Sequence, residues 1–119
     1  VDFTIAHPAG YELSPDFTKG ATITHNQKEA LADADFIYVK NWSAYEPYGK
    51  VFGGYDDWML TNDSLKNTNN AKVMHCLPVR RNLELSDEIL DGPSSVVVHE
   101  AGNRVWAAQA VLKQMLESL

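Results

Sequence analysis

The residues best suited to chemistry in this chain are its few arginines. The chain carries a net charge of −6, and its three arginines are Arg80, Arg81 and Arg104. A guanidinium group binds carboxylate or phosphate oxygens through two parallel hydrogen bonds, which makes arginine a natural anion ligand. We therefore expect an anion-binding site near these residues. The alternative for the first two is surface pairing with the nearby acids Glu84, Asp87 and Glu88.

The single thiol, Cys76, allows two interpretations. A lone cysteine cannot form an internal disulfide, which favours a reducing cytoplasm. The thiol either packs as a small apolar group or lines a site whose cations set its pKa. The four histidines lack a metal-ligand spacing such as i,i+4 on a helix, and no glycine-rich phosphate loop occurs. We predict no metal and no cofactor; the histidines are His7, His25, His75 and His99.

The elements that must position these groups follow a strand–helix alternation. Short runs of β-branched and aromatic residues predict strands at 2–6, 21–24, 36–39, 72–76 and 95–99. Near-continuous apolar runs of this kind are typical of a parallel sheet buried on both faces. The predicted fold class is therefore α/β, a parallel sheet flanked by helices.

Four segments between and after these strands are compatible with helices. Residues 27–34 follow Asn26, a good capping residue, 62–67 form a weaker candidate, and Ser86 begins a third. The last helix is predicted from one apolar stripe. Its members are Val105, Ala108, Val111, Leu112, Met115, Leu116 and Leu119.

The stretch 41–61 fits neither a helical nor a strand period and holds half of the aromatic residues. An irregular segment of this length is usually functional or mobile. A surface loop pinned by aromatic side chains and a loop that covers a substrate are equally compatible with it.

Length and charge limit the function classes. The 119 residues suit one domain, and a net charge of −6 argues against nucleic-acid or anionic-membrane partners. We expect no transmembrane helix and no signal peptide, because no apolar run is long enough and the start lacks a basic region. In parallel sheets, ligands bind beyond the carboxyl ends of the strands. The three arginines all follow predicted strands, so we expect one cationic edge there.

The run His-Cys-Leu-Pro at 75–78, extended by Val-Arg-Arg-Asn, resembles the transcarbamylase family. Glu-Ala-Gly-Asn-Arg at 100–104 is similar to the branch that acts on N-acylated ornithines, and so are residues 7–13 and 36–42. The resemblance runs over essentially the whole chain. It implies a Rossmann-like half of a transcarbamylase, incomplete at its N-terminus. Residues 1–119 would be part of the C-terminal ornithine-binding domain, without the carbamoyl-phosphate domain.

The resemblance also implies roles for individual residues. Cys76 and Leu77 fall where the family holds the carbamoyl group, and Arg104 falls on the arginine that binds carbamoyl phosphate. Arg80 falls on an arginine that contacts the acylated ornithine, and Lys40 on a substrate-binding lysine. Cys76 and Arg104 are thus the expected catalytic residues. The family's enzymes are trimers that transfer a carbamoyl group from carbamoyl phosphate to an amine, in arginine biosynthesis for this branch.

Lys40 provides a physical argument for the branch. Enzymes for free ornithine have an acidic residue after the equivalent strand, which suits an α-ammonium group. Acylation removes that ammonium and leaves a carboxylate, so a cation becomes the better partner, and Lys40 and Arg80 supply two. An unpaired buried charge costs about 3–5 kcal/mol. We therefore expect an N-acylated L-ornithine as the substrate.

The segment after Lys40 favours a succinyl over an acetyl group, because its Asn-Trp and its two tyrosines, Tyr45 and Tyr48, look closer to that branch. A carbamoyltransferase for free ornithine or another amine, and a non-catalytic binding or assembly module, stay as alternatives. We expect residues 1–119 alone to show no turnover, since the family's phosphate-binding loop is not among them.

Overall fold

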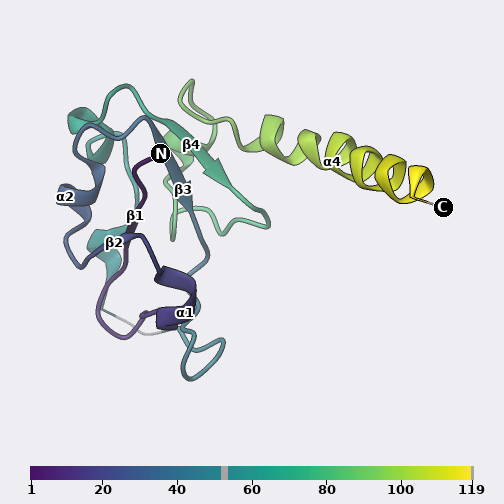
Figure 1. Ribbon diagram of the computed structural model, residues 1–119. Helices are drawn as coiled ribbons and strands as arrows, with labels where there is room; N and C mark the ends of the chain where they lie inside the picture. The colour runs from purple at the N-terminus through teal and green to yellow at the C-terminus, as the bar shows by residue number, and fades with distance from the viewer. Residues whose placement is uncertain (52–53, 119) are drawn as a thin grey trace.

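The computed structural model describes residues 1–51 and 54–118, and it builds an α/β unit from short parallel strands (Figure 1). The predicted positions Phe52, Gly53 and Leu119 lie outside the described residues. Strand β1 (Thr4–Ala6) pairs in parallel with β2 (Thr22–Thr24), and β3 (Phe36–Val39) pairs in parallel with β4 (Lys72–His75). Four of the five predicted strands and the α/β class are therefore confirmed. The described strands form two two-stranded ladders and not one continuous sheet.

The helices begin largely where capping chemistry places them. Helix α2 (Gln27–Leu31) starts behind Asn26, whose side chain accepts a hydrogen bond from the Glu29 amide at 3.3 Å. It ends earlier than predicted, because Ala32 has extended backbone and Asp33 has a positive φ of 55°. Helix α3 (Asp87–Leu90) follows Ser86, and two 3-10 turns, η1 (Asp56–Trp58) and η2 (Ser64–Asn67), lie between β3 and β4.

One short helix, α1 (Pro15–Thr18), is absent from the sequence-based prediction. The Ser14 hydroxyl accepts from the Asp16 amide at 3.4 Å, and proline occupies the first turn. Proline is favoured there because its missing N–H has no partner in a first turn anyway.

The prediction of a fifth strand at 95–99 is wrong. Ser95 makes a single parallel bridge with Val73, and helix α4 (Val97–Glu117) begins two residues later. The Glu100 amide donates to the Val96 carbonyl at 2.8 Å, which closes the first helical turn. A short apolar β-branched run is compatible with both structures, and its pattern alone does not separate them. Residues 100–104 accordingly lie inside a helix and not after a strand.

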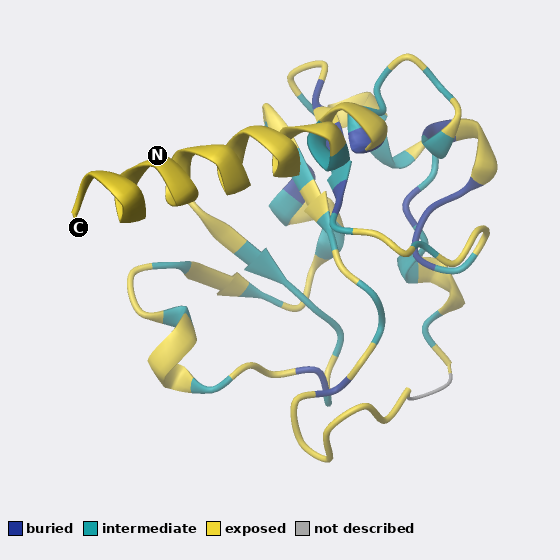
Figure 2. Cartoon of the chain, turned by 90° about the vertical axis from the view of Figure 1, so that its right-hand side faces the viewer, coloured by how far each residue is buried: buried dark blue, intermediate teal, exposed yellow. Residues whose placement is uncertain are grey.

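The predicted C-terminal helix is confirmed, but its apolar stripe packs against nothing in the described chain. Helix α4 extends away from the body (Figure 1), and its outer turns are coloured as exposed in Figure 2. Five stripe residues are 57 to 64% exposed: Val105, Val111, Leu112, Met115 and Leu116. No described helix is both long enough and apolar enough to cross a membrane.

The core lies beneath the β3–β4 ladder. Val73 of β4 is fully buried and contacts a cluster formed by Leu31, Leu60, Leu85 and Ile89. Leu60 and Leu85 also form a parallel bridge, with backbone hydrogen bonds of 3.0 Å on either side. This packing fixes β4 and the loop that leaves its carboxyl end.

The described parts of the segment 41–61, residues 41–51 and 54–61, are irregular apart from η1 and the bridge at Leu60, as the sequence predicts. Tyr55 donates its hydroxyl proton to the Ala9 carbonyl at 2.7 Å and packs edge-to-face against Tyr11. Tyr45 packs edge-to-face against Phe17 of α1. Aromatic side chains therefore pin this loop to the first third of the chain.

Candidate functional site

The register of β3 and β4 brings two of the expected site residues together. Val39 is paired with His75, so the residues that follow them, Lys40 and Cys76, emerge side by side. The Lys40 ammonium donates to the Cys76 sulfur at 3.4 Å. Lys40 is exposed and Cys76 is half-buried, so the ammonium remains open to a ligand.

Two further contacts join the same pair of loops. The Asn41 side-chain amide donates to the Pro78 carbonyl at 3.1 Å. The Arg80 guanidinium donates to the Trp42 carbonyl at 3.4 Å. Residues 40–42 and 76–80 thus meet in three successive contacts, which set Lys40 and Arg80 along one edge.

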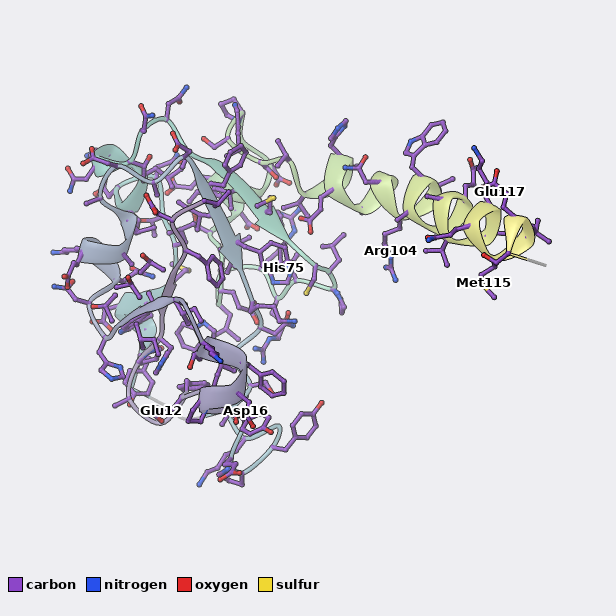
Figure 3. All side chains as sticks on the ribbon, in the orientation of Figure 1. Glu12, Asp16, His75, Arg104, Met115 and Glu117 are labelled. Carbon is purple, nitrogen blue, oxygen red and sulfur yellow. The ribbon has the colours of Figure 1, made fainter. Side chains whose placement is uncertain are left out.

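A cleft of about 330 Å³ opens beside these loops. Its lining includes three of the five predicted site residues, Cys76, Leu77 and Arg104. Arg104 comes from α4 and is exposed, and Figure 3 shows its side chain projecting from the lower side of the helix. Lys40 and Arg80 are not part of the lining. Lys40 contacts a lining residue, because its ammonium donates to the Cys76 sulfur.

Leu77 has a left-handed backbone conformation, with φ of 54°. Such a φ is uncommon for a residue with a branched side chain and persists only where the surroundings hold it. The Leu77 amide donates to the Nδ1 atom of His75 at 2.9 Å, which stabilises this turn. His75 therefore orders the loop that carries Cys76 and Leu77.

His75 is a neutral imidazole of known tautomer. Its side chain is buried, and burial is the largest of the effects that lower its pKa, with the Lys40 charge adding to it and Glu84 and Glu100 opposing it. Because Nδ1 accepts a hydrogen bond from the Leu77 amide, the ring proton must lie on Nε2, which has no partner among the described residues. The His75 amide in turn donates to the Glu100 carboxylate at 3.1 Å, which ties β4 to α4.

Arg80 is held by a buried carboxylate. Glu84 has a fully buried side chain, and its two oxygens accept from the Arg80 amide at 3.1 Å and from Nε at 2.7 Å, with an ion pair to Nη2 at 2.5 Å. The Arg80 side chain is 43% exposed, so one face of the guanidinium stays accessible. The pairing of Arg80 with Glu84 that the sequence suggested is present. It is not a solvated surface pair, because the Glu84 side chain is fully buried.

Arg81, by contrast, belongs to the surface. It pairs with Asp87 and with Asp91 at 2.7 Å each, and all three side chains are about half exposed or more. These hydrogen bonds raise the pKa of Arg81 and lower the pKa of both carboxyl groups. Its guanidinium is thus occupied and carries no role in the cleft.

Four residues that line the cleft are not among the predicted site residues: Tyr38, His75, Glu100 and Ala101. Desolvation is the first cause, and the Glu100 charge the second, of a raised pKa at the Tyr38 phenol, which therefore stays protonated at neutral pH. These residues lie at the ends of β3 and β4 and at the start of α4. Proximity to the predicted strand ends is therefore the sequence feature from which they could have been predicted.

Short parallel strands with a polar cleft at their carboxyl ends, which Arg104 and Glu100 line, define an α/β ligand-binding domain. Sequence comparison makes this class specific. The domain family described as "Aspartate/ornithine carbamoyltransferase, Asp/Orn binding domain" matches residues 1–115. The chain belongs to this family.

Individual relatives agree with this assignment. An N-succinylornithine carbamoyltransferase of Bacteroides thetaiotaomicron is 45% identical over 99% of this chain and 38% of its own length. An ornithine carbamoyltransferase of Methanosarcina mazei is 37% identical over 98% of this chain and 42% of its own length. A crystal structure of an acetylornithine transcarbamylase complexed with acetylcitrulline superimposes with a TM-score of 0.85 at 26% identity, over 93% of this chain and 39% of that one. The chain thus spans about two-fifths of the length of the proteins it matches.

Proposed function

We propose that this chain is the substrate-binding portion of a carbamoyltransferase, which transfers the carbamoyl group of carbamoyl phosphate to the side-chain amine of an N-acylated L-ornithine. The observation that carries the proposal is the joint position of Lys40 and Arg80 on two loops that contact each other at the strand ends. Two cations on adjoining loops suit a substrate with carboxylates and without a free α-ammonium group.

Electrostatics distinguishes this substrate from free ornithine. Lys40 presents an exposed ammonium, and the exposed face of Arg80 lies on the adjoining loop. A free α-ammonium would be repelled by Lys40, whereas the α-carboxylate of an acylated substrate gains a charge-assisted hydrogen bond. The ammonium leaves its weak contact with the Cys76 sulfur for a carboxylate oxygen, which is the stronger acceptor.

The cleft supports the transfer step. Arg104 and the loop of Cys76 and Leu77 line one cavity, so a carbamoyl carbonyl bound there meets a guanidinium where negative charge develops as the amine attacks. The side-chain amine adds to the carbonyl carbon, the C–O bond to phosphate breaks, and the amine loses a proton. The products are an N-acylated citrulline and inorganic phosphate.

The chain covers 38% of the succinylornithine relative, and we propose that a carbamoyl-phosphate domain completes the site within a homotrimer. The exposed stripe of α4 suits a cover of this kind, because five apolar side chains there are more than half exposed. Residues 1–119 alone should therefore bind the amine substrate without turning it over. A reducing cytoplasm is the compartment that suits the free thiol of Cys76.

A succinyl group is the favoured acyl group. Succinylation adds a second carboxylate, which the exposed part of the Arg80 guanidinium could bind beside its ion pair with Glu84. Acetylation leaves one carboxylate, which Lys40 alone could bind. The 45% identity to the succinylornithine relative agrees with this choice.

The test compares kcat/KM of the full-length enzyme for N-succinyl-L-ornithine, N-acetyl-L-ornithine and L-ornithine. Lys40→Ala should lower kcat/KM for the acylated substrate by about 10- to 150-fold, the equivalent of one hydrogen bond to a charged group. Lys28→Ala, at an exposed lysine of α2, is the matched control and should change nothing. A higher kcat/KM for free ornithine than for either acylated form would overturn the proposal.

A further inference from the structure

Two histidines and a carboxylate meet at the carboxyl ends of β1 and β2, outside the cleft. Ala6 pairs with Thr24 in the parallel ladder, so the next residues, His7 and His25, are direct neighbours. The His7 amide donates to the Thr24 carbonyl at 3.3 Å, which extends the ladder to this point. The two rings lie edge-to-face with centroids 4.8 Å apart.

Glu12 returns to the same point by a tight turn. Gly10 has φ of 89°, and its amide donates to one Glu12 carboxylate oxygen at 3.0 Å. This hydrogen bond is the largest cause of a lowered pKa at Glu12, so the carboxylate is ionised at neutral pH. Tyr55 holds the turn from outside through the Ala9 carbonyl. Figure 3 shows Glu12 on the α1 side of the body, well apart from His75.

The hydrogen bonds of the imidazoles fix their tautomers. Nδ1 of His25 lies 2.9 Å from the His7 carbonyl, and Nδ1 of His7 lies 3.0 Å from the Pro8 carbonyl. A carbonyl only accepts, so Nδ1 carries the proton in both rings and Nε2 keeps its lone pair. Metal-ligating histidines are oriented in this way, with the second ring N–H bonded to a backbone carbonyl or a carboxylate.

The distances are short enough for a shared ion. A ring nitrogen of each histidine and a Glu12 carboxylate oxygen all lie within 4.8 Å of one another. Ligand atoms around a tetrahedral Zn²⁺ are roughly 3.3 Å apart, from metal–nitrogen distances of about 2.0–2.1 Å. Glu12 and His25 are exposed, so side-chain rotation can close the difference. The three residues line a cleft of about 450 Å³, which leaves room for the ion and a water molecule.

We propose that His7, Glu12 and His25 form a binding site for a borderline divalent cation of the Zn²⁺ type, with the two imidazole Nε2 atoms and one carboxylate oxygen as ligands. Imidazole nitrogens favour Zn²⁺ over Mg²⁺ or Ca²⁺, which prefer oxygen ligands alone. The ion would link the turn 8–12 to the β1–β2 ladder and keep its fourth position open to water. The site does not depend on the proposed transferase activity.

Titration with Zn²⁺ alone, followed by calorimetry, tests the site. The wild-type protein should bind one ion, and His25→Ala and Glu12→Gln should each weaken binding at least about tenfold, the loss seen even for an outer partner of a metal ligand. His99→Ala, at an exposed histidine of α4, is the matched control and should bind as the wild type does. Circular dichroism checks that each variant keeps its fold.

The visible absorption spectrum of bound Co²⁺ tests the same site independently. Tetrahedral coordination by imidazole and carboxylate should produce intense visible absorption bands in the wild type and in His99→Ala, but not in His25→Ala. The absence of one-to-one Zn²⁺ binding in the wild type would overturn the proposal. So would equal Zn²⁺ affinity in the wild type and the His25 and Glu12 variants.

Discussion

Arg80→Ala is expected to destabilise the fold, because it leaves the buried Glu84 carboxylate without its ion-pair partner. The Glu84 side chain is fully buried, and the substitution removes its contacts with Nε and Nη2 but keeps the hydrogen bond from the backbone amide at position 80. Breaking a buried ion pair costs about 3–5 kcal/mol. Because Arg80 is itself 43% exposed, water screens part of the interaction, and we expect a loss of about 2–3 kcal/mol. The folding equilibrium constant should then fall roughly 30- to 150-fold.

Urea unfolding measures this loss directly. The midpoint should fall by about 1 M, with the slope unchanged, for the slopes usual in small proteins. Arg81→Ala is the matched control, because its partners are solvated, and it should cost less than Arg80→Ala. The double variant Arg80→Ala/Glu84→Gln should recover part of the loss, since no uncompensated buried charge remains. Equal losses for Arg80→Ala and Arg81→Ala would refute the reasoning.

Three further predictions concern pH, capping and turnover. Burial lowers the pKa of His75 below its ordinary value of 6.5, so the free energy of unfolding should decrease as the pH falls below that value, by up to about 1.4 kcal/mol per pH unit. Urea unfolding between pH 5 and 8 measures this dependence, and His75→Gln should make it shallower. An unchanged slope in His75→Gln would contradict the buried neutral imidazole. Asn26→Ala should cost about 1 kcal/mol by removing the cap of α2. Asn103→Ala, at an exposed position inside α4, removes no cap and should cost less, and thermal unfolding compares the two; equal losses would contradict the capping role. Residues 1–119 should release no phosphate from carbamoyl phosphate in a colorimetric assay, and release that strictly requires added acylornithine would disprove this.

The loops that carry the site could be predicted because their register follows from strand pairing. Parallel strands of similar length end at the same edge of a sheet, so the residues that follow 36–39 and 72–75 are expected near each other, and the observed register places Lys40 beside Cys76. The cationic character of this edge follows from the sequence in the same way. The roles of all five predicted site residues in binding or catalysis stay predictions: Lys40, Cys76, Leu77, Arg80 and Arg104.

Other features depend on tertiary contacts that no local pattern encodes. The burial of Glu84 requires the chain to fold back over β4, so the acid looked like an ordinary surface partner. The run 95–99 is apolar in either structure, and the backbone contact of Glu100 with Val96 decides for a helix. His7 and His25 are 18 residues apart and become neighbours only through the β1–β2 register, which a search for helical ligand spacing does not detect.

Binding of the acylated substrate tests the central claim most directly. Isothermal titration of the protein with N-succinyl-L-ornithine, N-acetyl-L-ornithine and L-ornithine separates the charge types without requiring turnover. We predict tighter binding of the acylated compounds than of free ornithine, with the succinyl compound the tightest, and a loss of this preference in Lys40→Ala. Equal or tighter binding of free L-ornithine, or no heat with any of the three, would contradict the assignment of Lys40 and Arg80 to the substrate carboxylates.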